Sequence, residues 1–249
     1  MNVNLILFLL LAGLMCFIGK EKGRLALFAL FLNLFFLFLM LLFINWGFPP
    51  IPMTLIVSLI ITALNLFFIN GSNTKTMIAF FSSFLVLLLL LVLIFLSVNS
   101  MHLQGLPMEE LMEMDMYSLN IGISFLSLSI SVMIMSAVGA INDIAISMTS
   151  AIDEIHRTNS ELTKSDLFNS GVTIGKDILS STMNTVIFAL VGGQLALFIW
   201  VSDLNYTLSQ FFNSKILVFE WVSLLLSGIA IILTIPISAY LMVLYLKKK

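Results

Sequence analysis

The chain has 249 residues, of which 60% are hydrophobic and 10% are charged, and its formal net charge is −2. A soluble domain devotes about a quarter of its residues to charge, so these figures and a mean hydropathy of +1.14 exclude an ordinary soluble fold. The charge pattern also shows no basic patch of the kind that binds nucleic acid. We therefore expect one all-α domain over residues 1–249, folded with the lipid bilayer as its main surroundings.

Long apolar runs follow one another along the chain, separated by short polar breaks. Each run is long enough, or nearly so, for a helix that crosses about 30 Å of hydrocarbon with about 20 residues. The runs are Val3–Ile18, Leu25–Asn45, Met53–Ile69, Met77–Val98, Leu119–Asn142, Leu179–Trp200 and Trp221–Leu246. The sequence thus predicts a polytopic helix bundle with about seven transmembrane helices.

The basic residues predict the orientation of this bundle. Ten of the eleven lysines and arginines, all but Lys215, lie in alternate connections or at the C-terminal end. Lysine and arginine stay on the cytoplasmic side of short loops. Seven helices with the N-terminus outside and the C-terminus in the cytoplasm satisfy this alternation.

The helices differ in character along the chain. Residues 1–98 are almost purely apolar and are typical of scaffold helices that face lipid. Small and polar residues enter the helices within residues 119–200, which also contain a long cytoplasmic connection, and residues 201–249 supply the last helix. We therefore expect the functional residues in the fifth and sixth helices.

The fifth predicted helix carries a face of small and polar residues. At helical spacing this face contains Ser129, Val132, Ser136, Gly139, Asp143, Ser147 and Ser150. Small residues allow helices to approach closely in a membrane, so one interpretation is a packing seam. Asp143 supports a second interpretation, a functional site, because a carboxylate inside the bilayer is costly and usually has a charged partner or a function. A third interpretation makes Asp143 a solvated charge at the end of the helix.

The sixth predicted helix repeats this pattern. One sector of its helical wheel contains Asp177, Ser181, Asn184, Thr185, Phe188 and Gly192. Asp177 alone is equally consistent with a capping carboxylate at a helix N-terminus. Residues 171–177 imitate a phosphate-binding loop, but they lack one spacer residue and the magnesium-binding hydroxyl, so we do not expect nucleotide binding.

Two adjacent antiparallel helices can bring these polar groups together. Carboxylate, amide and hydroxyl oxygens suit a proton or a hard monovalent cation. We predict an ion, proton or substrate cluster formed by Asn142, Asp143, Ser147, Asp177, Ser181, Asn184 and Thr185. We assign helix packing to Ser136, Gly139, Ala140, Gly175 and Gly192.

Some of these residues also resemble the pattern of a known family. The relevant stretches are Gly71–Thr76, Gly139–Ser147, Gly171, Gly175–Ile178 and Asn184-Thr185. They resemble the signature of the YibE/F-like family of bacterial multi-pass membrane proteins, in its short form. The resemblance implies a bacterial plasma-membrane location and a longer YibE/F-type paralogue as a partner, with a homo-oligomer as the alternative. It implies no particular activity.

Two functions remain open at this point. The leading hypothesis is a transporter or permease-like protein whose polar cluster couples a proton or cation to the movement of a substrate. The alternative is a non-transporting partner subunit or assembly factor. We do not expect an enzyme, a cofactor or a bound metal, because the sequence contains no convincing nucleophile, metal triad or acid pair. Alternate methionines at 108–116 suit Cu(I), but an interfacial helix opened by Pro107 is the favoured interpretation.

The predicted orientation has a direct test. A reporter enzyme that works only in the cytoplasm should be active when it is fused after Lys249. Activity of a reporter that works only outside the cytoplasm, fused at the same position, would contradict the predicted topology.

Overall fold

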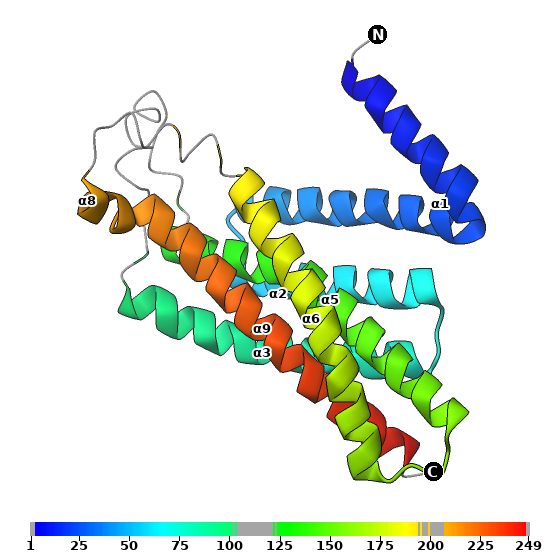
Figure 1. Cartoon of the computed structure of the whole chain (residues 1–249). Coiled ribbons are helices and arrows are strands. Elements are labelled where there is room, and N and C mark those ends of the chain that lie inside the picture. Colours follow the sequence, from blue (N-terminus) through cyan, green and yellow to red (C-terminus); the bar gives the residue numbers. More distant parts are fainter. Residues whose placement is uncertain are drawn as a thin grey trace.

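A computed structural model describes residues 3–101, 103, 122, 124–193, 195, 199 and 207–247. In this part of the chain every regular element is a helix (Figure 1). The helices are α1 (Val3–Asn45), α2 (Pro50–Ala63), the π-helical η1 (Leu64–Phe68), α3 (Thr74–Ser100), α5 (Phe125–Thr158), α6 (Lys164–Gly193), α8 (Leu208–Phe212) and α9 (Lys215–Leu246). The methionine-rich loop at 108–116 lies outside the described residues.

Six of the described helical segments are long and apolar enough to cross a membrane. They are α1, α2 together with η1, α3, α5, α6 and α9. This confirms the all-helical, membrane-type fold that the sequence predicts. The difference from the predicted seven spans arises in α1, which contains both of the first two predicted spans. The count of seven and the orientation of the termini stay predictions.

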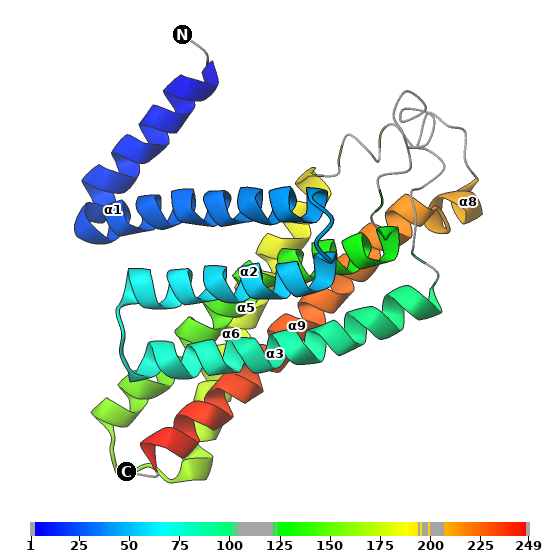
Figure 2. The ribbon, with the colours of Figure 1, turned by 180° about the vertical axis from the view of Figure 1, so that it is seen from behind.

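Helix α1 is broken at Lys20. This residue has φ 49° and ψ −126°, which is not a helical conformation. Three residues later, Gly23 lies so close to the backbone of Met15 that a Cβ atom would overlap the Met15 carbonyl. The two halves of α1 therefore run in different directions, and the half that follows the break lies beside α2 (Figures 1 and 2).

Helix α5 lies at the centre of the bundle and contacts α2, α3, α6 and α9. Its apolar residues include the fully buried Ile134, Ile141, Ile144 and Met148. In contrast, the first half of α1 leaves the bundle at an angle (Figures 1 and 2). The side chains that hold the bundle together thus come mainly from α5 and the helices around it.

The connection between α2 and α3 is set by local hydrogen bonds. Gly71 has φ 77°, a conformation that glycine adopts without steric cost. Asn73 then caps α3, because its Oδ1 accepts a bond from the Thr76 N–H at 3.1 Å and its N–H donates to Thr76 Oγ1 at 3.0 Å. This reciprocal cap fixes the start of α3, and with it the position of Lys75.

Helices α5 and α6 are longer than the sequence predicts at the ends that join them. Helix α5 continues to Thr158 and α6 begins at Lys164. Most of the predicted connection between the fifth and sixth helices is therefore helical, and only residues 159–163 form the turn.

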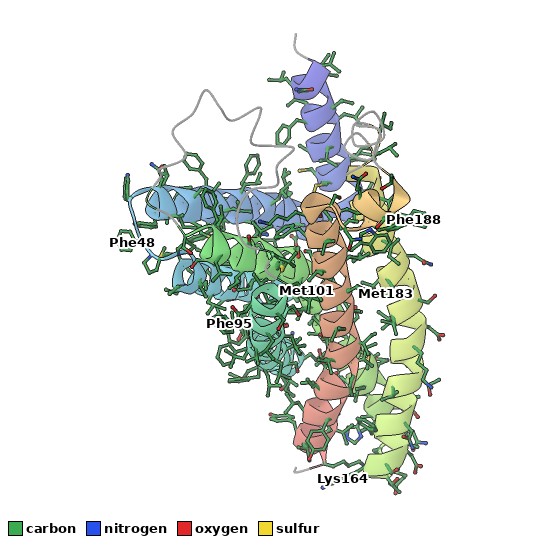
Figure 3. All side chains as sticks on the ribbon, turned by 90° about the vertical axis from the view of Figure 1, so that its left-hand side faces the viewer. Phe48, Phe95, Met101, Lys164, Met183 and Phe188 are labelled. Carbon is green, nitrogen blue, oxygen red and sulfur yellow. The ribbon has the colours of Figure 1, made fainter. Side chains whose placement is uncertain are left out.

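Helix α6 packs onto the bundle through two glycines. Gly171 lies against Ile152 of α5, and Gly175 lies against Met148 of α5 and Ile235 of α9. Farther along α6, Met183 lies between α6 and α9 (Figure 3), where its side chain approaches Gly228. Because side chains larger than hydrogen do not fit at Gly171 and Gly175 without displacing their neighbours, these positions set the distance between the helices.

We predict that Gly175→Val destabilises the protein by about 1–3 kcal/mol, the usual cost of inserting atoms into a packed interior. Gly139→Val on α5 is the matched control, since nothing lies within 4 Å of a Cβ atom added there. Thermal unfolding of both variants in mild detergent measures the difference. Equal midpoints for the two variants would contradict the packing described here.

Candidate functional site

Asp143 lies near the middle of α5, on its exposed side. The helix continues to Thr158, and the next acidic residue, Asp153, is ten residues farther on. At 1.5 Å per residue this separation is about 15 Å, which is half of a hydrocarbon core about 30 Å thick. If Asp153 marks the membrane surface, Asp143 lies near the mid-plane. Because α5 continues to Thr158, Asp143 does not mark the end of the helix, and its depth in the membrane stays a prediction.

Asn142 points in a different direction from Asp143. Its side chain is buried, and its Nδ2 donates a hydrogen bond of 3.1 Å to Thr62 Oγ1. Thr62 belongs to α2 and is itself fully buried. The Asn142 side chain therefore links α5 to α2 inside the bundle, while Asp143 is turned outward.

The polar residues of α6 lie on the side opposite its packing glycines. Asp177, Ser181, Asn184 and Thr185 are all exposed, whereas Gly171 and Gly175 are buried. The Thr185 hydroxyl donates to the Ser181 carbonyl of its own helix at 3.0 Å. The polar side chains on this part of α6 therefore point away from the bundle.

The two sets of exposed residues lie at similar heights on neighbouring helices. Gly175 of α6 lies against Met148 of α5, and the two helices are antiparallel across the short turn at 159–163. Asp143 lies five residues before Met148 on α5, and Ser180 lies five residues after Gly175 on α6. Because the two helices are antiparallel, Asp143 and Ser180 lie at about the same level, and Ser181 follows Ser180. We call the following exposed residues the polar face: Asp143, Ser147, Asp177, Ser181, Asn184 and Thr185.

The polar face is open. Within the described part of the chain, no hydrogen bond or ion pair joins its α5 residues to its α6 residues. The structure thus exposes six of the seven predicted cluster residues on α5 and α6 and turns Asn142 inward. Their predicted role in binding an ion, a proton or a substrate stays a prediction.

The residues that we assigned to helix packing lie in different surroundings. Ser136 Oγ lies 3.2 Å from Ser223 Oγ and 3.3 Å from Ser227 Oγ, which joins α5 to α9. Ala140 packs at the edge of the core cluster that includes Ile144 and Met148. Gly175 lies in the close contact with Met148 and Ile235 described above. A Cβ atom added at Gly139 or Gly192 would meet no atom within 4 Å.

A charged group that is only partly visible in the sequence lies near the end of α5. Asp153 is 7% exposed, and its Oδ2 is 3.3 Å from Lys75 Nζ and 3.0 Å from Arg157 Nε. The pair with Arg157 follows the i,i+4 spacing of a helix and is visible in the sequence. The pair with Lys75 joins α3 to α5 and has no local signal.

This charged group lines a cavity of about 300 Å³ together with His156 and Tyr245. The Nδ1 atom of His156 is buried and accepts or donates no hydrogen bond within the described residues. His156 is therefore half-buried beside the ion pairs. No group of three or more His, Cys, Asp or Glu side chains that could hold a metal ion is found in the described ranges.

The class of protein follows from these observations. An all-helical chain with six helices long and apolar enough to cross a membrane is a multi-span membrane protein. The chain matches the family model described as YibE/F-like protein over residues 7–248, and it belongs to that family. This confirms the resemblance seen in the sequence and extends it over nearly the whole chain. No curated protein and no protein of solved structure matches the chain.

The ion pairs of Asp153 predict a loss of stability on mutation. Asp153→Asn removes the buried charge that holds Lys75 and Arg157, so we expect a loss of about 1–2 kcal/mol, less than for a fully buried pair because both cations reach water. Glu154→Gln, one residue away and exposed, should change stability by less than about 0.5 kcal/mol. Thermal unfolding in mild detergent compares them, and the same unfolding midpoint in both would argue against the role of Asp153.

Proposed function

We propose that this protein is a transport-type membrane protein that moves a proton or a hard monovalent cation along the polar face of α5 and α6, at a contact with a second membrane-spanning chain. The second chain is another copy of this protein or a longer YibE/F-type paralogue. The observation that carries the proposal is the open polar face with Asp143 near the middle of α5.

The position of Asp143 supports the transport function. A carboxylate near the centre of a bilayer costs about 2.5–3.5 kcal/mol on insertion scales, and such residues usually mark ion paths or proton relays. Asp143 makes no ion pair with the other described residues. Hydroxyl and amide groups of Ser147, Ser181 and Asn184 are also exposed at similar levels of α5 and α6, where they can bind a cation or relay a proton.

The openness of the face supports the second chain. The six exposed polar side chains of α5 and α6 would otherwise face lipid. By contrast, some buried hydroxyls of the bundle interior, those of Ser82, Thr149 and Thr234, already donate to backbone carbonyls of their own helices and need no second chain. Covering the face with another chain encloses the polar groups between two proteins.

The same proposal includes the topology and the location. Lys75, Arg157, Lys164 and Lys247 come to one end of the bundle, the end at which α6 begins and α9 finishes (Figure 3). We assign this end to the cytoplasm of a bacterial cell by the positive-inside rule. The break at Lys20 then lets the two halves of α1 serve as the first two of seven spans.

One observation favours the alternative of a non-transporting partner subunit or assembly factor. Asn142, which the sequence placed in the ion cluster, is buried in a hydrogen bond to Thr62 and serves the packing of α5 on α2. Under this alternative the polar face binds a partner and moves no ion. The two functions share the second chain and differ in ion movement, so separate experiments test them.

Cysteine crosslinking tests the second chain. The chain contains a single cysteine, Cys16, so a Cys16→Ser background carrying Asn184→Cys places one thiol on the polar face. We expect an oxidant to give a disulfide-linked dimer, or a mixed dimer with the paralogue when the two are expressed together. The control is Leu225→Cys in the same background, at an exposed position of α9. Equal crosslinking of both variants would contradict a specific contact at the polar face.

Proton or cation flux tests the transport function. The purified protein, with the paralogue where crosslinking shows one, is reconstituted into liposomes that contain a pH-sensitive dye or a Na⁺- or K⁺-sensitive dye. Asp143→Asn should abolish the flux because it removes the charge and leaves the shape, while Asp166→Asn, outside the polar face, should retain it. A crosslinked assembly whose flux equals that of empty liposomes would leave the partner subunit as the function.

A further inference from the structure

A groove runs along α9 from the basic end of the bundle toward the membrane interior. Its outer part is lined by Lys164, Leu244, Tyr245 and Lys247. Its middle part shares Lys164 and Leu244 with the outer part and adds Ser165, Phe168, Tyr240 and Val243. Its inner part shares Phe168 and Tyr240 with the middle part and continues over Leu85, Pro236, Ile237 and Leu241. The shared residues make these three hollows one continuous groove, which we call the α9 groove.

The α9 groove changes from charged to apolar along its length. The outer hollow has a volume of about 500 Å³ and carries the ammonium groups of Lys164 and Lys247. The middle and inner hollows have volumes of about 330 Å³ and 450 Å³ and are lined almost entirely by carbon atoms. A cationic entrance that leads into an apolar channel is complementary to a molecule with an anionic head and a hydrocarbon chain.

The cations at the entrance are available to a ligand. Lys164 is exposed and forms no ion pair within the described residues. Lys247 donates one hydrogen bond of 2.8 Å to the Ser160 carbonyl, and an ammonium group has three donors. The two side chains therefore retain most of their capacity to donate to phosphate oxygens.

The length of the groove matches one leaflet. Pro236 and Lys247 are eleven residues apart on α9, which corresponds to about 16 Å along the helix. One leaflet supplies half of a hydrocarbon core about 30 Å thick. A lipid whose phosphate lies at Lys164 and Lys247 would place the end of its acyl chain near Pro236, at the inner end of the groove.

We propose that the α9 groove binds an anionic phospholipid of the leaflet at the basic end of the bundle. The phosphate contacts Lys164 and Lys247, Ser165 supplies a hydroxyl beside it, and one acyl chain lies along Phe168, Tyr240 and Ile237. Basic pockets between transmembrane helices are known to bind such head groups. The lipid would stabilise the contact between α6 and α9. The α9 groove contains no residue of the polar face, so this proposal does not depend on whether the polar face transports an ion.

The test uses the full chain in mild detergent with dioleoyl phosphatidylglycerol as the probe and native mass spectrometry as the measurement. Dioleoyl phosphatidylcholine has the same chains and a neutral head group, so it should be retained less. A lysine near an anionic lipid contributes about five-fold in affinity, so Lys164→Gln with Lys247→Gln should weaken phosphatidylglycerol binding by about 30-fold. Lys20→Gln with Lys22→Gln, at the break in α1, is the matched control and should bind like the unmodified protein.

A second pair of variants tests the apolar part of the groove. Leu244→Trp fills the groove between its outer and middle parts, and it should reduce phosphatidylglycerol binding without removing a charge. Leu225→Trp, at an exposed position elsewhere on α9, should not. Because Leu244 and Leu225 are both exposed, neither substitution disturbs the packed interior.

Three outcomes would overturn the proposal. The first is equal retention of phosphatidylglycerol and phosphatidylcholine by the unmodified protein. The second is phosphatidylglycerol binding that survives both the lysine substitutions and Leu244→Trp. The third is displacement of the lipid by millimolar inorganic phosphate together with no effect of Leu244→Trp, which would indicate a site for a free anion. Selective lipid binding that is lost in both variants supports the proposal.

Discussion

The close approach of α6 to α5 and α9 at Gly171 and Gly175 determines how the rest of the candidate site is presented. These glycines face Ile152, Met148 and Ile235. Residues one turn apart, at i+3 or i+4, lie on the same side of a helix. Asp177 and Asn184 lie two and nine residues after Gly175, which is about half a turn around the helix, so the inward position of the glycines turns them outward. The exposure of the α6 polar residues is thus a consequence of packing on the other side of the same helix.

A second constraint acts at the basic end of the bundle. Asp153 holds Lys75 of α3 and Arg157 of its own helix, and the Asn73 cap fixes the start of α3 beside them. The ion pairs and the cap therefore place α3 and α5 at a common level. This common level is the reference from which the depth of Asp143 can be counted along α5.

Hydrophobic runs made the overall fold predictable, but not every element in it. The apolar runs and the small-residue pattern were sufficient to expect an all-helical membrane bundle and the polar side of α5. The continuation of α5 to Thr158 was less visible, because polar residues at its surface end resemble a loop as much as an exposed helix. The break at Lys20 fell where a polar segment separated two predicted spans.

The candidate site was predictable only in part, for reasons of geometry. Asn142 and Asp143 are adjacent in sequence, yet neighbouring side chains on a helix point about 100° apart, so one faces α2 and the other faces outward. Their grouping in one cluster could not be tested without the positions of the neighbouring helices. The pairing of Lys75 with Asp153 joins residues far apart in the chain and depends on how α3 packs on α5. Neither the types of these two residues nor their spacing in the sequence predicts this ion pair.

The break in α1 has a consequence for how the protein can be divided. All four buried residues of α1, which are Gly23, Ala29, Met40 and Ile44, come after Lys20. The segment before the break shares almost no interior surface with the remaining helices, so its side chains are free to be matched to the surrounding lipid or to a neighbouring chain. Sequence changes there can alter how the protein sits among its neighbours while the packing of the other helices is preserved.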